Sequence, residues 1–78
     1  MVGTMWKEVD GKLTARFEFD DFNQALDFVN SVGKLAEEVN HHPDIKFGWG
    51  YVELELFSHS ENQITDKDRE LADKIIKL

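Results

Sequence analysis

Three histidines and two carboxylates are the side chains of this sequence whose types and spacing suggest chemistry. His41 and His42 are adjacent, with Glu37 four residues before the first of them. His59 and Asp68 follow further along the chain. A histidine side chain titrates at about pH 6.5, so imidazoles beside carboxylates suit general acid–base catalysis near neutral pH. Neutral imidazole is also the commonest metal ligand in proteins, so the same residues allow a divalent-metal site.

Acid–base catalysis is the stronger of these two interpretations. Adjacent histidines in an extended segment point to opposite sides, so His41 and His42 cannot easily bind one ion together. The helical pair of histidines at four-residue spacing, which many metal sites use, does not occur in this sequence. No serine or cysteine stands in a nucleophile motif, and no glycine-rich phosphate loop is present. Covalent nucleophilic catalysis and a phosphate-binding loop are therefore without support.

Each of these residues also has a purely structural explanation. Three histidines among 78 residues could be ordinary surface residues, and Glu37 could be a solvated helix residue. Asp68 could belong to a helix cap, a role compatible with orienting His59 through its carboxylate. Pro43 is explained by helix termination, because proline lacks an N–H and disfavours the helical conformation of the residue before it. All three histidines nevertheless fall at the ends of expected elements and outside every apolar stripe, which favours a site.

The composition limits the kind of protein that can carry such a site. Residues 1–78 form one domain, whose small core makes a lone monomer marginally stable, so we expect oligomerisation. The sequence has no cysteine, which excludes disulfides and thiolate metal sites. Nine basic against sixteen acidic residues give a net charge of −7, which would repel a nucleic-acid backbone. Because there is no apolar run of ~18 residues and no charged-then-apolar leader, we expect a cytoplasmic protein with no membrane partner.

The first half of the chain predicts a hairpin followed by a long helix. Residues 6–10 and 13–19 are expected strands joined at Asp10-Gly11, a register that pairs Trp6 with Ala15 and Glu8 with Leu13. A helix then begins at Asp20 or Asp21, and Asp21 with Gln24 resembles a capping box. Its apolar residues recur at three- and four-residue steps as far as Val39. This stripe is wide enough to cover a sheet and to touch a second subunit.

The second half of the chain predicts another hairpin and a shorter helix. Residues 45–58 alternate in polarity, and we expect a type II′ loop at Gly50-Tyr51. That loop pairs Trp49 with Val52, Phe47 with Leu54, Ile45 with Leu56, and Lys46 with Glu55. The last helix begins at Thr65 and has Asp68 three residues later. The order β-β-α-β-β-α predicts an α+β fold with a four-stranded antiparallel sheet and both helices packed on one face.

Five features stand at characteristic spacings along the chain: Glu37, His41-His42-Pro43, Trp49, His59 and Asp68. Together with residues 17–25 and 64–68, where the two helices start, they resemble the signature of the pterin-4a-carbinolamine dehydratases. The resemblance runs from about Trp6 to the C-terminus. It implies the α+β fold derived above and a metal-free lyase without a cofactor. Such a lyase dehydrates 4a-hydroxytetrahydropterin to quinonoid dihydropterin, and so recycles the tetrahydrobiopterin cofactor of aromatic amino acid hydroxylases.

The resemblance also implies a role for each site residue. His41 would be the main general acid/base, His59 its complement, and His42 a residue that binds and orients the pterin. Glu37 and Asp68 would hold the charge state and tautomer of their imidazoles. The pterin ring would be lined by the backbone around Pro43 and by Ser58, His59, Ser60 and Glu61. Trp49 is a further candidate for substrate binding, although its position near a turn favours a core role.

Departures from the family pattern leave alternatives open. Family members commonly begin with an additional helix before the Trp6 region, for which this chain has no room. We expect the surfaces that this helix would cover to be bare or covered by a partner, in a homodimer or homotetramer. Trp49 stands where tyrosine is common, and Gln63 stands where glycine is frequent, which alters the loop before the last helix. One alternative is action on another pterin, for example a molybdopterin-related one. The other is a protein-binding or dimerisation module, since some animal members stabilise the dimer of a homeodomain transcription factor.

Overall fold

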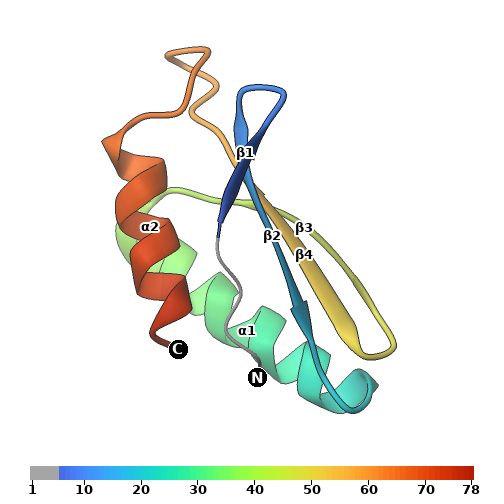
Figure 1. Cartoon of the computed structure of the whole chain (residues 1–78). Helices are drawn as coiled ribbons and strands as arrows, with labels where there is room; N and C mark the ends of the chain where they lie inside the picture. The colour runs from blue at the N-terminus through green and yellow to red at the C-terminus, as the bar shows by residue number, and fades with distance from the viewer. Residues whose placement is uncertain (1–5) are drawn as a thin grey trace.

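A computed structural model of the protein describes residues 6–78. Its elements, in chain order, are β1 (Lys7–Val9), β2 (Lys12–Glu18), α1 (Phe22–Val39), β3 (Asp44–Gly48), β4 (Tyr51–Leu56) and α2 (Asp66–Ile76). The strands form one antiparallel sheet in the order β1-β2-β4-β3, and both helices lie on the same side of it (Figure 1). The predicted α+β fold is therefore confirmed. The expectation of a missing leading helix concerns residues before Trp6, which lie outside the described range.

Local signals in the sequence set the start of the first hairpin and of α1. Asp10 and Gly11 have φ angles of 51° and 77°, the left-handed pair that a type I′ hairpin loop requires. The structure pairs Glu8 with Leu13, which confirms the predicted register. Asp21 is the N-cap of α1, and its Oδ1 accepts a hydrogen bond from the Gln24 N–H at 2.8 Å. Aspartate at this position satisfies one of the amide groups left unpaired at a helix start.

The register predicted for the second hairpin is wrong by two residues. Phe47 pairs with Val52 rather than Leu54, and the loop is Trp49-Gly50 rather than Gly50-Tyr51. Gly50 has a φ angle of 79°, which glycine adopts without a steric penalty. Gly48 lies opposite Tyr51, and a Cβ at Gly48 would be 2.8 Å from Cε1 of the tyrosine ring. Glycines at these two positions therefore select the observed loop.

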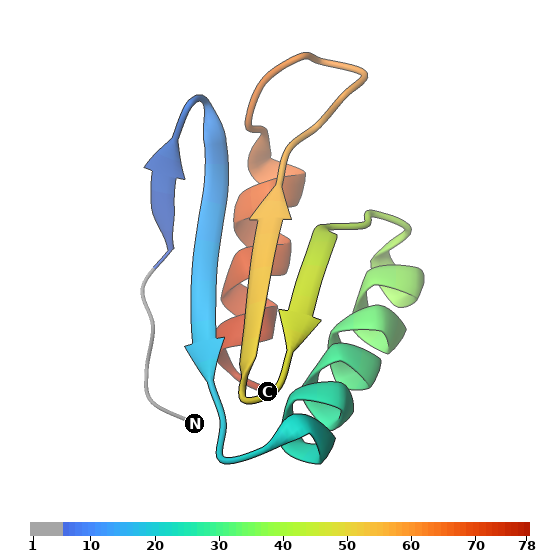
Figure 2. The same cartoon turned by 90° about the vertical axis from the view of Figure 1, so that its right-hand side faces the viewer.

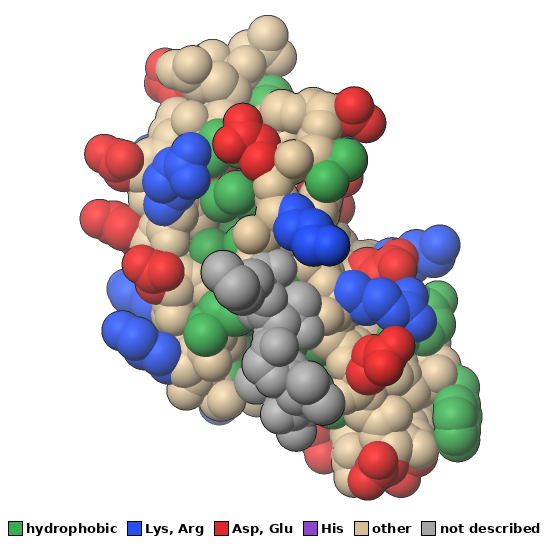
Figure 3. Space-filling view, in the orientation of Figure 1, with side chains coloured by type: hydrophobic (Ala, Val, Ile, Leu, Met, Phe, Trp, Pro, Cys, Tyr) green, Lys and Arg blue, Asp and Glu red, His purple; other side chains and the backbone are tan. Residues whose placement is uncertain are grey.

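The shift by an even number of residues leaves the faces of the second hairpin unchanged. Ile45 and Phe47 lie on the predicted side, but Lys46 faces Glu53 instead of Glu55. Glu53 accepts a hydrogen bond from Arg16 of β2 at 2.7 Å, and Lys12 pairs with Glu55 at 3.3 Å. Polar and charged residues thus occupy the solvent side of the sheet. Figure 3 shows acidic and basic side chains interspersed over one face of the molecule, without a single basic patch on it.

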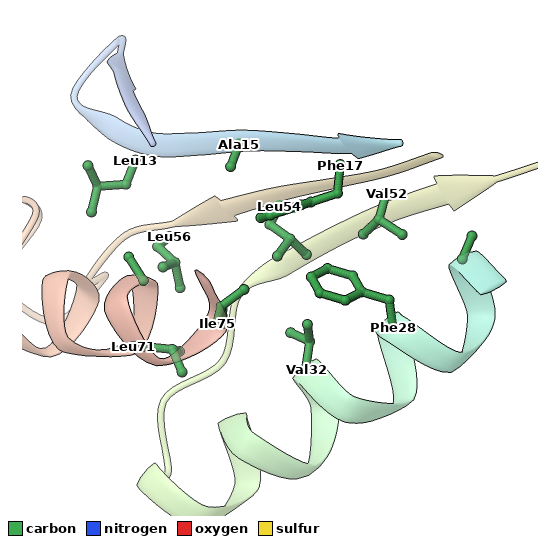
Figure 4. Packing of buried hydrophobic residues seen from close by; sticks show 12 residues of the cluster. Leu13, Ala15, Phe17, Phe28, Val32, Val52, Leu54, Leu56, Leu71 and Ile75 are labelled. Carbon is green, nitrogen blue, oxygen red and sulfur yellow. The ribbon is translucent and has the colours of Figure 1, made fainter. Parts of the chain in front are cut away.

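The core lies between the other side of the sheet and the two helices. Figure 4 shows side chains of β2 and β4 pointing toward residues of α1 and α2. The buried apolar residues are Leu13, Ala15, Phe17, Ala25, Phe28, Val32, Ala36, Val52, Leu54, Leu56, Leu71, Ala72 and Ile75. This packing brings the end of α1, the end of β4 and the start of α2 to one end of the molecule, as the view in Figure 2 shows. Within residues 6–78, neither helix has the length and apolar character needed to cross a bilayer.

Candidate active site

The carboxyl end of α1 positions the two adjacent histidines. Asn40 has a φ angle of 53°, and its N–H bonds to the carbonyl of Glu37 at 3.3 Å. The His41 N–H bonds to the carbonyl of Ala36 at 3.1 Å. These two bonds form a Schellman motif, in which asparagine takes the left-handed position that glycine usually occupies. The last residue of the helix is Val39, and the left-handed Asn40, three residues before Pro43, terminates it rather than the proline.

His41 is hydrogen bonded to the buried carboxylate of Asp68. Its Nε2 lies 2.5 Å from Asp68 Oδ1, and the Asp68 side chain has no exposed surface. The other carboxylate oxygen, Oδ2, accepts from Ser58 Oγ at 2.7 Å and from the Thr65 N–H at 2.9 Å. The bond to Thr65 confirms Asp68 in the cap of α2. The sequence prediction that Asp68 orients His59 needs correction, because the structure places this carboxylate on His41.

The surroundings of Asp68 favour its ionised form. Burial by itself raises the pKa of the carboxyl, but hydrogen bonds from His41, the Thr65 N–H and the Ser58 hydroxyl outweigh it and lower the pKa of Asp68. An ionised carboxylate can only accept hydrogen bonds, so the His41 Nε2 must donate. In the neutral ring the proton is then on Nε2, and Nδ1 has a lone pair that can take a proton from a bound molecule.

His42 and Glu37 form a second histidine–carboxylate pair in a different environment. Nε2 of His42 contacts Oε2 of Glu37, which lies in the last turn of α1. The two side chains are 53% and 77% exposed, so solvent screens the attraction between them. The pair therefore contacts at the surface, with neither side chain buried.

His59 is presented by a short closed loop after β4. Ser58 and Gln63 form an isolated bridge, with reciprocal backbone hydrogen bonds of 3.2 and 3.3 Å. The left-handed residue of this loop is Asn62, with a φ angle of 54°, so the loop does not need a glycine at Gln63. The imidazole of His59 meets the ring of Phe57 edge-on, with centroids 5.1 Å apart. The histidine is itself exposed.

One cleft of about 550 Å³ joins the two halves of the predicted site. It is lined by Asn40, His41, His42, Phe57, Ser58, His59, Ser60, Glu61, Thr65, Asp66 and Lys67. All three histidines and the run from Ser58 to Glu61 therefore lie around one cleft, although they come from different elements. Another hollow, on the solvent side of the sheet around Arg16 and Glu53, has no histidine in its lining.

Two predicted substrate-binding residues do not line this cleft. Pro43 lies between His42 and β3, and Trp49 is in the β3–β4 loop at the opposite end of the strands (Figure 2). Trp49 is 73% exposed, so it does not have the core role that its position also suggested. The alternation used for Trp49 assumed the wrong hairpin register, which counted this loop residue as part of a strand.

Sequence reasoning missed other residues that line the cleft. Phe57 follows the last strand directly, and Thr65 was recognised only as the start of the last helix. Asn40, Asp66 and Lys67 carried no motif signal. Among residues 6–78, no group of three or more histidine, aspartate or glutamate side chains has a geometry that could hold a metal ion.

Comparisons with known proteins identify the family. The sequence matches the model of the family described as pterin 4 alpha carbinolamine dehydratase over residues 2–78. The chain belongs to this family. A protein of Rubrobacter xylanophilus, provisionally named pterin-4-alpha-carbinolamine dehydratase, is 50% identical over 74 residues, which are 94% of this chain and 69% of the relative. A protein of Sulfolobus acidocaldarius with the same provisional name is 41% identical over 73 residues, 94% of this chain and 80% of the relative.

Two solved structures share the fold. A crystal structure from Brucella melitensis, described as a transcriptional coactivator/pterin dehydratase, is 35% identical with a TM-score of 0.84. That alignment covers 90% of this chain and 77% of the other. The second protein, described as pterin dehydratase-like and a RuBisCO assembly factor in the alpha-carboxysome, is 25% identical with a TM-score of 0.76. It covers 97% of this chain and 88% of the other. One of these two proteins is thus described as a coactivator as well as a pterin dehydratase, and the other as an assembly factor.

Proposed function

We propose that this protein is a hydro-lyase that dehydrates 4a-hydroxytetrahydropterin to quinonoid dihydropterin, the activity of a 4a-hydroxytetrahydrobiopterin dehydratase. The observation that carries the proposal is the shared cleft: His41 comes from the end of α1, His59 follows β4, and both line it. His41 is in addition held by a buried carboxylate. Membership of the carbinolamine dehydratase family supports the same reaction.

The reaction needs an acid and a base and no change of oxidation state. The C4a–O bond breaks as the departing hydroxyl takes a proton, and N5 loses its proton as a C4a–N5 double bond forms. One protonated and one neutral imidazole supply these two transfers. We assign His41 as the main acid–base group and His59 as its complement, because only His41 has a buried carboxylate to fix its ring. His42, Ser60 and Glu61 line the same cleft and would contact the pterin.

Replacement of His41 tests the proposal directly. We expect His41→Ala to lower the dehydration rate by about 10²- to 10⁴-fold, the usual contribution of a positioned acid–base group. The fold should be retained, because the His41 side chain is partly exposed and outside the apolar core, but the buried Asp68 loses a partner, which lowers the free energy of unfolding. The measurement is carbinolamine dehydration by purified protein, with circular dichroism as the check on folding. Ser31→Ala, an exposed change in the middle of α1, is the matched control and should turn over like the wild type.

Two results would contradict the assignment. Wild-type turnover by His41→Ala would remove its catalytic role. Loss of wild-type activity after treatment with a chelator would favour metal-assisted chemistry instead. The same assay with carbinolamines that carry different side chains separates recycling of tetrahydrobiopterin from action on another pterin, such as a molybdopterin-related one. An aromatic amino acid hydroxylase in the same genome would favour the recycling role.

Protein binding is the second candidate function. The descriptions of the two solved relatives, one as a coactivator and one as an assembly factor, support it. A large exposed aromatic side chain, Trp49, lies far from the cleft and could contact a partner. Recovery of a stoichiometric protein partner by a pull-down, together with no pterin turnover, would favour this function over the dehydratase.

A further inference from the structure

Ser58 lies at the centre of the polar contacts beneath the cleft. It is 5% exposed, and its backbone N–H and carbonyl both bond to Gln63. Its Oγ is 2.7 Å from Asp68 Oδ2 and 2.7 Å from Thr65 Oγ1. The backbone bonds fix the position of Ser58, and its hydroxyl is already engaged by two polar partners. Ser58 lines the cleft as the sequence predicted, but its hydroxyl contacts Asp68 and Thr65, which indicates a role other than binding substrate.

The direction of each hydrogen bond follows from the charge of Asp68. An ionised carboxylate accepts only, so the single proton of the Ser58 hydroxyl goes to Asp68 Oδ2. The contact between the two hydroxyls then requires Thr65 Oγ1 to donate and Ser58 Oγ to accept. At the other oxygen, Asp68 accepts from His41. No buried side-chain nitrogen or oxygen within residues 6–78 lacks a hydrogen-bond partner.

We propose that Ser58 is a positioning residue for His41. Its hydroxyl, oriented by Thr65, holds the Asp68 carboxylate so that the neutral imidazole keeps its proton on Nε2 and Nδ1 as the proton acceptor. The proposal rests on the proposed function, because it explains how the acid–base group is kept ready. Asp68 contacts the backbone of the α2 cap through the Thr65 N–H, whereas the Ser58 side chain contacts only the Thr65 hydroxyl and no backbone group of the cap. Changes at Ser58 therefore separate positioning of the imidazole from capping of the helix.

The test reads the tautomer of His41 in the substrate-free protein. At about pH 8 the ring of an ordinary histidine is neutral, and ¹⁵N chemical shifts of its two nitrogens distinguish the protonated one. We expect the Nε2–H form in the wild type and a mixture with the Nδ1–H form in Ser58→Ala. The kcat of this variant should fall by about tenfold or more, the effect of losing a hydrogen bond to a charged group. KM should stay within about twofold, because the lost group does not bind substrate.

Matched variants that keep or remove a hydroxyl group serve as controls for this test. Ser58→Thr retains a hydroxyl and should restore the Nε2–H form. Thr65→Val removes the outer donor and also the hydroxyl of the α2 capping box, whereas Thr65→Ser keeps both, so only the valine variant should disturb the tautomer. This second pair also tests the chain if Ser58→Ala does not fold. A pure Nε2–H tautomer and unchanged kcat in both Ser58→Ala and Thr65→Val would overturn the proposal.

The experiment distinguishes failure of the Ser58 positioning proposal from failure of the proposed dehydratase function. If Ser58→Ala changes the tautomer but the wild-type protein does not dehydrate the carbinolamine, the proposed function fails and the positioning of His41 by Ser58 stands. If the wild type is active and the tautomer is insensitive to Ser58, the positioning proposal fails alone.

Discussion

Asp68 and Glu37 each hold one imidazole, but their surroundings differ in a way that decides what each pair contributes. Asp68 has no exposed surface, and its carboxylate accepts three hydrogen bonds from groups that the fold holds in place: His41, Ser58 and Thr65. Glu37 is largely exposed and contacts His42 across a screened surface. A buried carboxylate that loses a partner leaves polar groups unsatisfied, whereas an exposed one regains water.

Replacement of Asp68 should therefore cost stability in a pH-dependent way. We expect Asp68→Asn to lower the free energy of unfolding by about 2 kcal/mol at pH 7. The pKa of Asp68 is lowered in the folded protein, so its carboxylate stabilises the fold above its ordinary unfolded-state pKa. That stabilisation is lost as the pH falls through the lowered folded-state pKa. Urea unfolding of the wild type and Asp68→Asn across this acidic range should show the difference shrinking as the pH falls.

Glu37→Gln is the matched control for this prediction. It removes the charge of the exposed pair, so the free energy of unfolding should change by less than about 1 kcal/mol. An equal loss of stability in both variants, or a difference between wild type and Asp68→Asn that does not vary with pH, would contradict the buried-carboxylate account.

At the scale of secondary structure, the end of α1 is the element that decides where the imidazoles lie. The Schellman motif turns the chain at Asn40 and leads directly into His41. The loop after β4 positions His59, and its left-handed residue is Asn62. Each half of the site therefore contains one residue in a backbone conformation that most side chains would adopt only under strain.

Substitution of Asn40 should reveal this dependence. Asn40→Ala should destabilise the protein by about 1 kcal/mol, because alanine tolerates the left-handed conformation less well than asparagine. Asn40→Gly should be as stable as the wild type or slightly more so, since glycine carries no such penalty. Thermal unfolding of both variants checks the prediction. Asn30→Ala, in the exposed middle of α1, is the control and should not destabilise. A loss of stability in Asn40→Gly equal to that in Asn40→Ala would contradict it.

At the scale of the whole molecule, the sheet order places β4 between β2 and β3. The end of β4 lies at the same end of the molecule as the end of α1 and the start of α2 (Figure 2). Three elements far apart in the sequence thus contribute to one cleft. The chain that builds this arrangement is small, and it leaves large apolar side chains exposed, among them Phe22, Ile45 and Trp49. Such a small domain is only marginally stable as a monomer.

The expectation of a homodimer or homotetramer can be tested by concentration. Association stabilises a folded chain by mass action, so Tm should rise as the protein concentration is increased. Sedimentation equilibrium should give a mass at least twice that of the 9.1 kDa chain. A Tm independent of concentration together with a monomer mass would contradict oligomerisation.

Much of the fold follows from signals that act within a few residues. Asp10-Gly11 determined a type I′ loop, and Asp21 and Thr65 marked the helix starts, because caps and turns satisfy backbone groups of their close neighbours. Alternation determined which residues of β3 and β4 face the core. Alternation could not determine the register of this hairpin, because a shift of two residues preserves both faces. The observed register places Gly48 opposite Tyr51, where the tyrosine ring occupies the space that a Cβ would fill.

The sequence by itself determined the histidines, their acidic neighbours and the elements that carry them. Only the tertiary structure decided that Asp68 pairs with His41, 27 residues away, instead of His59. It also placed Trp49 at the end of the sheet far from the cleft. The physical reason is that periodicity and capping depend on residues within about a turn or a loop. The partner of a buried carboxylate depends instead on how helices and sheet pack over the core.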